Sequence, residues 1–472
     1  MVTVALSHPQ EEQAPASGVT HQPLLQAGVN TLVTNLVQVA LSVFVTVALS
    51  RKLGPASKGI YDLCIASVTL AVSIVGLSLP SGITFAVASG RASPRKLVRV
   101  SGVIALGQAA LLLCTLWILP ARISGSVLPL SAGLWVVGWV IALFLVESAR
   151  SYWRALLIGR MRYLQANYAD LAKAVVLAAC VALMLLPKSL ANLTATRLAI
   201  AATVGGAACS AWFALKWVAA PKDDTGKGIQ LGTILRISLP SWLANVVQTT
   251  NYRFGLFAVN TAIGLSAAGL YQSGATIVQL LNLIPAAAAA ILYPLTAKMT
   301  AESRDQAHGT ACVARLVFWT TGAISIVLAT SAPLLVRLLF GRPFLPSIPV
   351  IWALLPGNTI FVIATVIAAF IAGRGLPELN LVASVVGLVV CAPLTIWLAR
   401  DFGLVGAAWG STLGLLANAL CLIVFFMRDT KLGAHVLVFP QPGDRALLAR
   451  AGRGVLLSVR NCGRFAAVAA DR

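Results

Sequence analysis

Polar side chains recur at helical spacing along the first strongly apolar segment of this chain. The residues are Thr31, Asn35, Gln38, Ser42 and Thr46. An α-helix places side chains three and four positions apart on one face, so these amides and hydroxyls form a stripe. Amides and hydroxyls donate and accept hydrogen bonds without charge, which suits sugar hydroxyls. The stripe therefore predicts the lining of a cavity for a polyhydroxylated ligand, although membrane helices also use such residues to bond to one another.

The stripe recurs 210 positions later, as Ser241, Asn245, Gln248 and Tyr252. The same offset brings Gly54–Tyr61 onto Gly264–Tyr271, with two glycines and a tyrosine in register. A polar stripe and a glycine pattern that repeat at one offset indicate an internal duplication. Duplicated halves in an apolar chain are typical of transporters, which hold substrate where the halves meet. We therefore favour a cavity over helix packing, and the candidate substrate-binding residues are Asn35, Gln38, Asn245 and Gln248.

The composition is that of an integral membrane protein. Hydrophobic residues make up 58% of the 472 residues, charged residues 10%, and the mean hydropathy is +0.88. Soluble domains carry about a quarter charged residues. The 35 Lys and Arg against 14 Asp and Glu give a formal charge of +21. Basic cytoplasmic loops facing anionic lipid explain this excess, and no basic stripe with interleaved aromatics indicates nucleic-acid binding.

Twelve apolar runs are long enough to cross a hydrocarbon core of about 30 Å. They lie at 28–50, 59–89, 100–119, 127–146, 167–186, 198–219, 237–263, 266–297, 316–336, 346–372, 379–399 and 403–427. The sequence thus predicts an all-α membrane protein with twelve transmembrane helices in two duplicated six-helix bundles. The bundles span 28–219 and 237–427, and a polar cytoplasmic linker at 220–236 joins them.

Lys and Arg crowd one alternate set of loops, in which we place Arg150, Arg154, Arg160 and Arg162. By the positive-inside rule this set faces the cytoplasm, so we expect both termini there. Residues 1–27 lack the basic residues of a secretory signal and are expected to form a short cytoplasmic leader. Residues 428–472 are expected to form a basic cytoplasmic tail. The expected location is the cell inner (plasma) membrane.

The predicted loops are too short to hold a catalytic domain. An ATP-driven pump would need a nucleotide-binding domain, and the chain has no GxxxxGK[ST] sequence. The eight cysteines form no CxxC pair and have no metal-ligand spacing with the four histidines. We therefore expect no enzyme activity, no cofactor and no metal site.

Charged side chains inside a membrane cost about 2.5 kcal/mol or more, so each one predicts a function or a partner. Arg253 lies well inside the seventh run, away from the polar stripe. We interpret it either as a ligand for a substrate phosphate or as a side chain that reaches outward to the membrane surface. Arg51 is expected to anchor at the membrane surface, and Asp62 to be an N-terminal charge of the second helix.

Two pairs of opposite charge lie near the predicted cytoplasmic ends of the fourth and fifth helices. Glu147 and Arg150 end the fourth helix, and Asp170 and Lys173 lie near the start of the fifth. Residues three apart on a helix compensate each other's charge locally. The four residues are also candidates for a cytoplasmic gate whose ion pairs exchange partners.

Four short motifs stand in the order found in one family of exporters. They are Arg51–Pro55 with Gly59–Tyr61, Asn251–Arg253 with Gly264–Tyr271, Leu339–Pro346, and Phe402–Ala408. Together they resemble the bacterial polysaccharide flippases of the multidrug/oligosaccharidyl-lipid/polysaccharide exporter superfamily, over about residues 28–427. The resemblance implies alternating access by two six-helix bundles. It also implies that the substrate is a polyprenyl-pyrophosphate-linked oligosaccharide, flipped from the inner to the outer leaflet.

The resemblance carries further expectations and two departures. It implies membrane lipids, a glycan polymerase and glycosyltransferases as partners. Asn251 is a substrate-binding candidate, but family members often carry an acidic residue there, so a charge-dependent role is in doubt. The chain also has fewer predicted helices than murein-lipid flippases, which argues against that branch.

Two other functions stay open on the sequence. A cation-coupled drug or metabolite antiporter of the same architecture would need a buried carboxylate, and the first and seventh helices have none over 31–50 or 238–259. A non-transporting scaffold of a glycan assembly complex differs from a flippase only in a transport assay.

Overall fold

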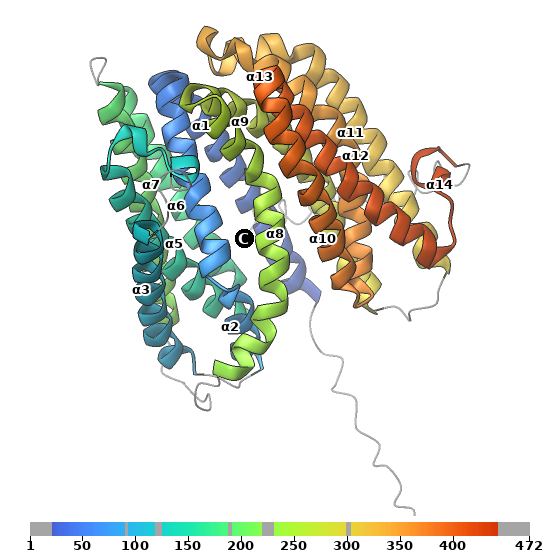
Figure 1. The fold of residues 1–472 in the computed structure, drawn as a ribbon. Coiled ribbons are helices and arrows are strands. Elements are labelled where there is room, and N and C mark those ends of the chain that lie inside the picture. Colours follow the sequence, from blue (N-terminus) through green and yellow to red (C-terminus); the bar gives the residue numbers. More distant parts are fainter. Residues whose placement is uncertain are drawn as a thin grey trace, which may run out of the picture.

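The computed structural model describes residues 21–89, 93–118, 125–186, 191–219, 231–298 and 304–441, and the regular structure in these ranges is helical (Figure 1). The long helices are α1 (His21–Val75), α3 (Pro94–Ile118), α5 (Trp135–Gly159), α6 (Tyr163–Leu185), α7 (Asn192–Ala219), α8 (Leu231–Ala262), α11 (Arg304–Leu339), α12 (Ile348–Gly373) and α13 (Pro377–Thr430). The shorter ones are α2 (Leu79–Ala88), α9 (Leu265–Gln279), α10 (Leu283–Lys298) and α14 (His435–Val438), with 3-10 turns η1 (Leu130–Ala132), η2 (Leu280–Asn282) and η3 (Arg342–Ser347).

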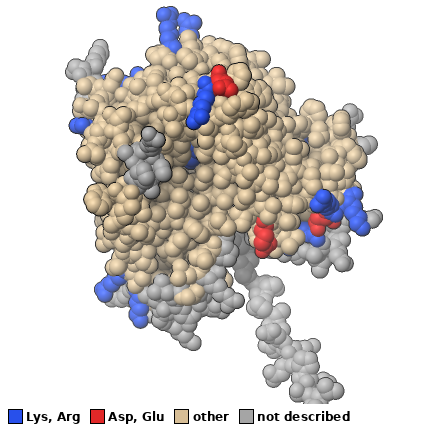
Figure 2. Space-filling model, viewed as in Figure 1, with Lys and Arg blue, Asp and Glu red and all other residues tan. Residues whose placement is uncertain are grey.

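Helices that are early in the chain gather on one side of the molecule and late helices on the other. In Figure 1, α3, α5, α6 and α7 lie on one side, and α10 to α13 on the other, with α8 and α9 between them. Helix α8 packs against both α2 and α13. Figure 2 shows a broad face almost free of charged side chains, with most Lys, Arg, Asp and Glu near its margins. Such a face suits contact with lipid.

Nine helical segments of the described ranges are long and apolar enough to cross a membrane. The protein is therefore an all-helical, multi-pass membrane protein. Two of the nine, α1 and α13, contain a residue with non-helical backbone angles and join two helices across a kink. Helix α8, which carries the second polar stripe and Arg253, has 32 residues but is not among the nine. The number of twelve crossings and the orientation of the termini stay predictions.

The kinks lie where the sequence predicts loops. Gly54 has φ +70° inside α1, and Gly403 has φ +61° inside α13. Only glycine adopts this left-handed region without strain, because it has no Cβ. The predicted loop at 51–58 is therefore a bend at a single glycine, and the second bend falls on Gly403, the first residue after the predicted loop at 400–402.

Three other predicted helices have different boundaries. The 59–89 run breaks at Gly76–Ser78, and Pro80 lies in the first turn of α2, where its missing N–H costs nothing. The 266–297 run divides at η2. The helix expected at 127–146 is α5, which begins at Trp135 and ends at Gly159. Charged residues after 146 interrupt the apolar run but not the helix, so hydropathy alone placed the end too early.

The glycines of the repeated sequence meet one another. A Cβ added to Gly59 would lie 2.0 Å from the Leu265 carbonyl oxygen, and one added to Gly269 would lie 2.0 Å from the Pro55 carbonyl oxygen. Helices α1 and α9 thus approach backbone to backbone, at two positions related by the 210-residue offset. Only glycine permits this distance.

The repeated tyrosines have matching partners. The Tyr61 hydroxyl hydrogen-bonds to Thr203 Oγ1 of α7 at 3.1 Å, and the Tyr271 hydroxyl to Ser411 Oγ of α13 at 2.9 Å. Both rings are buried. Each copy of the repeat therefore fixes a tyrosine to a helix far along the chain.

Arg51 holds α1 to the end of α11. Its Nε donates to the Leu339 carbonyl oxygen at 2.8 Å, and its guanidinium also donates to the carbonyl oxygen of Leu338. The last carbonyls of a helix have no partner within the helix and attract positive charge. The Arg51 side chain therefore caps another helix, which the sequence did not predict, and its expected role as a membrane-surface anchor stays a prediction.

Candidate functional site

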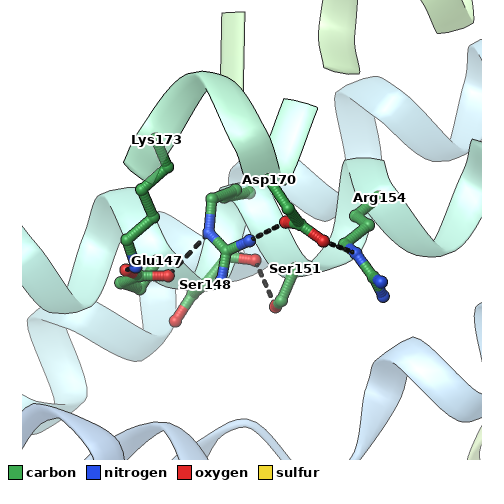
Figure 3. Close-up of polar contacts among 7 residues, drawn as sticks. Glu147, Ser148, Ser151, Arg154, Asp170 and Lys173 are labelled. Carbon is green, nitrogen blue, oxygen red and sulfur yellow. Dashed lines mark hydrogen bonds and ion pairs between the residues drawn. The ribbon is translucent and has the colours of Figure 1, made fainter. Parts of the chain in front are cut away.

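A polar cavity of about 550 Å³ lies among α1, α2, α5 and α6. Five charged side chains of α5 and α6 form a connected network here, and four of them line the cavity (Figure 3). Neutral polar residues, including Gln38 and Ser81, form other parts of the wall. The cavity thus combines hydroxyl and amide groups with charge, inside a bundle of apolar helices.

Arg150 lies at the centre of the network. Its Nε donates to Glu147 Oε2 at 2.7 Å, and its NH1 donates to Asp170 Oδ1 at 2.7 Å. Both carboxylates and the guanidinium are less than one-fifth exposed. Charge-assisted bonds of this kind are among the stronger hydrogen bonds in proteins. The bond to Glu147 lies within α5, and the bond to Asp170 joins α5 to α6.

Lys173 and Arg154 complete the network. Lys173 donates to Glu147 Oε1, and the Arg154 Nε donates to Asp170 Oδ2 at 2.6 Å. All four carboxylate oxygens therefore have a cationic partner. Three cations face two carboxylates, so the network carries one net positive charge.

The four predicted gate residues come together, but not as predicted. Asp170 and Lys173 do not pair with each other; each pairs with a residue of α5. Glu147 and Arg150 lie near the middle of α5 rather than at its end, because α5 continues to Gly159. Arg150 also belongs to a helix and not to a cytoplasmic loop. A gate role for these residues stays a proposal.

Among the substrate-binding candidates of the two stripes, Gln38 and Asn245 line cavities, and so do the stripe residues Ser42, Thr46 and Tyr252. Gln38 lies in the wall of the 550 Å³ cavity. Asn245 lines a neighbouring cavity of about 290 Å³, where its Nδ2 donates to Ser78 Oγ at 2.8 Å. The two cavities share Ser81 and Ser151 in their walls. Side chains from both stripes thus approach one polar region from α1 and α8.

Two other candidates bond to α13. The Gln248 Oε1 accepts a hydrogen bond from Ser384 Oγ at 3.1 Å, and Asn251 Nδ2 donates to the Ser384 carbonyl oxygen at 2.8 Å. Asn251 also lines a cavity of about 40 Å³, which is large enough for a water molecule. These bonds show that part of the second stripe joins helices, which was the alternative interpretation.

Asn35 is exposed and lines none of the cavities described above. Its neighbour on the stripe, Thr31, accepts a hydrogen bond from Asn167 Nδ2 of α6 at 2.9 Å. The first stripe therefore also serves both purposes, with helix contact at Thr31 and a cavity wall at Gln38. A substrate-binding role for Asn35 stays a prediction.

Arg253 is half-buried and lines two cavities, of about 180 and 320 Å³. It donates no hydrogen bond to another residue of the described ranges. Its electrostatic partner is Asp62 of α1, which also lines the 180 Å³ cavity. Asp62 Oδ1 accepts from Lys58, whereas Oδ2 is buried and has no hydrogen-bond partner in the described ranges. We expected Asp62 to be only a helix N-terminal charge. In the structure it also pairs with Lys58, lies near Arg253 and lines a cavity.

Sequence reasoning missed Arg154 and Asp62 as site residues. Arg154 was placed in a loop because charges ended the apolar run, although its spacing of four from Arg150 would have put both on one helical face. Lys58 and Asp62 have the same spacing, and that signal was available in the sequence. No group of three His, Cys, Asp or Glu residues in the described ranges could hold a metal ion.

Accessibility of the stripes to water can be measured. After replacement of the native cysteines, Gln38→Cys and Asn245→Cys should react with a small water-soluble thiol reagent in membranes, because both positions line polar cavities. Val247→Cys should stay unreactive, since Val247 is buried on α8 at 8% exposure. Equal protection at all three positions would show that the stripes serve helix packing alone.

The structure is similar to solved exporters. A lipid II flippase, MurJ, in an inward closed conformation matches with a TM-score of 0.67 and 11% identity, covering 88% of this chain and 90% of that chain. An inward-facing multidrug resistance MATE family transporter of the MOP superfamily matches with a TM-score of 0.61 and 16% identity, covering 84% and 94%. A MOP superfamily transporter from Pyrococcus furiosus matches with a TM-score of 0.55 and 15% identity, covering 86% and 94%. At these identities the likeness shows a shared fold.

The sequence itself matches a family. A comparison with the curated proteins finds no match. The family model described as "Polysaccharide biosynthesis protein" matches residues 48–349, which include most of the residues that line the charged cavity and all of its ion-pair network. The chain is therefore a multi-pass membrane protein that belongs to the polysaccharide biosynthesis protein family.

Proposed function

We propose that this protein moves a polyprenyl-pyrophosphate-linked oligosaccharide from the inner to the outer leaflet of the plasma membrane. The observation that carries the proposal is a polar, charged cavity of about 550 Å³ lined by residues of α1, α2, α5 and α6, in a member of a polysaccharide biosynthesis family. A hydroxyl-rich head group needs such a polar surface inside the hydrocarbon region, because unpaired polar groups are costly there. The lipid chains can stay outside, against the apolar face seen in Figure 2.

The fold supports an alternating-access mechanism. We propose twelve crossings, counting two each for α1 and α13 and one for α8, with both termini in the cytoplasm. The proposed bundles, 28–219 and 237–427, are joined by the linker 220–236. The contact between α1 and α9, where backbone meets backbone at Gly59 and Gly269, lies between these units, and we propose that the two tilt about it. A glycan polymerase and glycosyltransferases are proposed partners.

Arg253 is a proposed ligand for the pyrophosphate. It lines two cavities and donates no hydrogen bond within the described ranges, so its donors are available. Arginine binds phosphate oxygens with two parallel donors. Asn35, Gln38, Asn245, Gln248 and Asn251 are the proposed residues for neutral parts of the substrate.

A second function, a cation-coupled antiporter, is favoured by one observation. An antiporter needs a buried carboxylate, and the sequence has none over 31–50 of the first helix or 238–259 of the seventh. That search did not extend beyond residue 50 on α1. Asp62 lies just beyond, on the second segment of α1, and its Oδ2 is buried without a partner in the described ranges. A carboxylate of this kind can bind and release a proton during a transport cycle.

Deletion of the gene distinguishes these functions. A strain without the protein should accumulate lipid-linked glycan in the inner leaflet while its synthesis continues, because the proposal assigns the protein no step in assembly. The glycan facing each side can be measured with a membrane-impermeant lectin on right-side-out and inverted vesicles. A strain that stops before the lipid-linked product would contradict the flippase proposal. Normal distribution between leaflets would favour the antiporter or a scaffold.

A further inference from the structure

In the ion-pair network of the 550 Å³ cavity, both carboxylates are fully bonded, whereas one of the cations has nitrogens without a hydrogen-bond partner in the described ranges. Glu147 receives bonds from Arg150 and Lys173, and Asp170 receives bonds from Arg150 and Arg154. Every carboxylate oxygen is therefore used. The network nevertheless holds one more cation than anion, so one positive charge has no carboxylate of its own.

Arg154 is where this excess charge is available. Only its Nε bonds to Asp170, and its two terminal nitrogens have no hydrogen-bond partner in the described part of the chain. Figure 3 shows the terminal nitrogens of Arg154 turned away from the carboxylates. The side chain lines the cavity and is 36% exposed, against 19% for Arg150. Asp170 thus fixes the guanidinium while leaving its outer edge free.

A positive charge on a membrane-spanning helix needs an anion or water beside it. Charges in membrane-spanning helices face cavities and pair with other groups because hydrocarbon does not solvate them. The outer edge of an arginine presents two parallel donors that match two oxygens of a carboxylate or a phosphate. The surrounding wall adds neutral donors and acceptors from Gln38, Ser42, Ser81 and Thr84. The cavity volume lies within the range of about 300–1,000 Å³ usual for ligand sites.

We propose that Arg154 binds an anionic group of the substrate in this cavity, beside neutral residues that bind its hydroxyls. The inference rests on the proposed function and adds a substrate class: a glycan lipid whose bound part carries negative charge. Asp170 is a positioning residue for Arg154. The anionic group has one chemistry, a pair of oxygens sharing charge, and two possible sources. It is either a phosphate of the lipid carrier or a carboxylate on an acidic sugar.

Equilibrium binding to the purified full-length protein in nanodiscs tests this site. The probes are inorganic pyrophosphate, a glucuronate disaccharide and the neutral sugar maltose, measured by calorimetry at low salt. The wild-type protein should bind at least one anionic probe more tightly than maltose. Arg154→Gln should weaken that binding about tenfold, because a charge-assisted bond is lost. Tighter binding of pyrophosphate identifies the carrier phosphate, and tighter binding of glucuronate identifies an acidic sugar.

Two further variants make the test specific. Arg197→Gln removes the same charge from α7, outside the cavity, and should bind as wild type does. Arg154→Lys keeps the charge without the paired donors and should lose part of the affinity. If Arg154→Gln does not fold, this variant still tests the site. Unchanged binding in the folded Arg154 variants, or wild-type binding no tighter for either anion than for maltose, would overturn the assignment.

The site and the proposed function can fail separately. Accumulation of glycan in the deletion strain together with unchanged anion binding by Arg154→Gln would refute only the role of Arg154. Anion binding that depends on Arg154, in a protein whose deletion leaves the distribution of glycan between the leaflets normal, would refute the flippase function and keep the anion site.

Discussion

Gly59→Ala should strongly destabilise the protein, although it adds only one methyl group. The new Cβ would lie 2.0 Å from the Leu265 carbonyl oxygen and 3.1 Å from the Gly269 backbone nitrogen. Backbone atoms cannot rotate away as a side chain can, so α1 and α9 would have to separate. Overpacking of a tight interior typically costs about 1–3 kcal/mol, and a backbone collision belongs at the upper end. We expect a lower unfolding temperature in detergent and loss of transport.

Its matched control is Gly107→Ala on α3. A Cβ at Gly107 would meet no atom within 4 Å. Alanine is favoured over glycine in a helix by about 0.5–1 kcal/mol, so this variant should be as stable as wild type or more so. Gly269→Ala should behave like Gly59→Ala, since its Cβ would lie 2.0 Å from the Pro55 carbonyl oxygen. If Gly59→Ala and Gly107→Ala unfolded at the same temperature, the close helix contact would be wrong.

Asp170→Asn should have the second large effect. The amide keeps the shape of the side chain but removes the negative charge that Arg150 and Arg154 share. The network would then carry two excess positive charges among apolar helices. Breaking a buried ion pair from one side costs up to about 3–5 kcal/mol, since the remaining charge loses its partner. We expect the free energy of unfolding to fall by that order and transport to stop.

A surface carboxylate provides the comparison. Asp429→Asn also removes one partner of an ion pair, with Arg374, but Asp429 is 35% exposed, against 18% for Asp170. Exposed pairs contribute about 0–1 kcal/mol, so Asp429→Asn should unfold close to the wild-type temperature. The double variant Asp170→Asn/Arg154→Gln restores the original net charge and should recover part of the stability. A double variant less stable than Asp170→Asn would show that charge balance is not the cause.

Helical structure and its interruptions could be predicted because they depend on local chemistry. Long apolar runs indicated membrane helices, and Gly54 and Gly264 marked the bends, since glycine adopts a positive φ without strain. The repeat at one offset indicated that the two copies are alike, but not that Gly59 and Gly269 touch. Contact between distant segments depends on tertiary packing, which spacing along one helix does not describe.

The charged site could be predicted only in part for the same reason. The spacing of Glu147 and Arg150 predicted a local pair, and that pair is present at 2.7 Å. Spacing also predicted a pair of Asp170 with Lys173, whereas both turn to α5 instead. Once two helices pack, a carboxylate has cations from both within reach, and the sequence of one helix cannot rank them. The end of α5 was misplaced because hydropathy treats a charge as the end of a membrane helix.

The bond from Arg51 to the end of α11 has a mechanical consequence. The two carbonyl groups that Arg51 caps belong to Leu338 and Leu339, 287 and 288 residues further along the chain. Separating the two helices would leave these carbonyls and the guanidinium to be hydrated, or unpaired beside lipid at several kcal/mol per group. That cost resists separation of the first segment of α1 from the last turn of α11. Arg51 lies about two turns before Gly59, which contacts α9, so both contacts tie the two proposed units at the same part of α1 and a tilt between the units would have to pivot there.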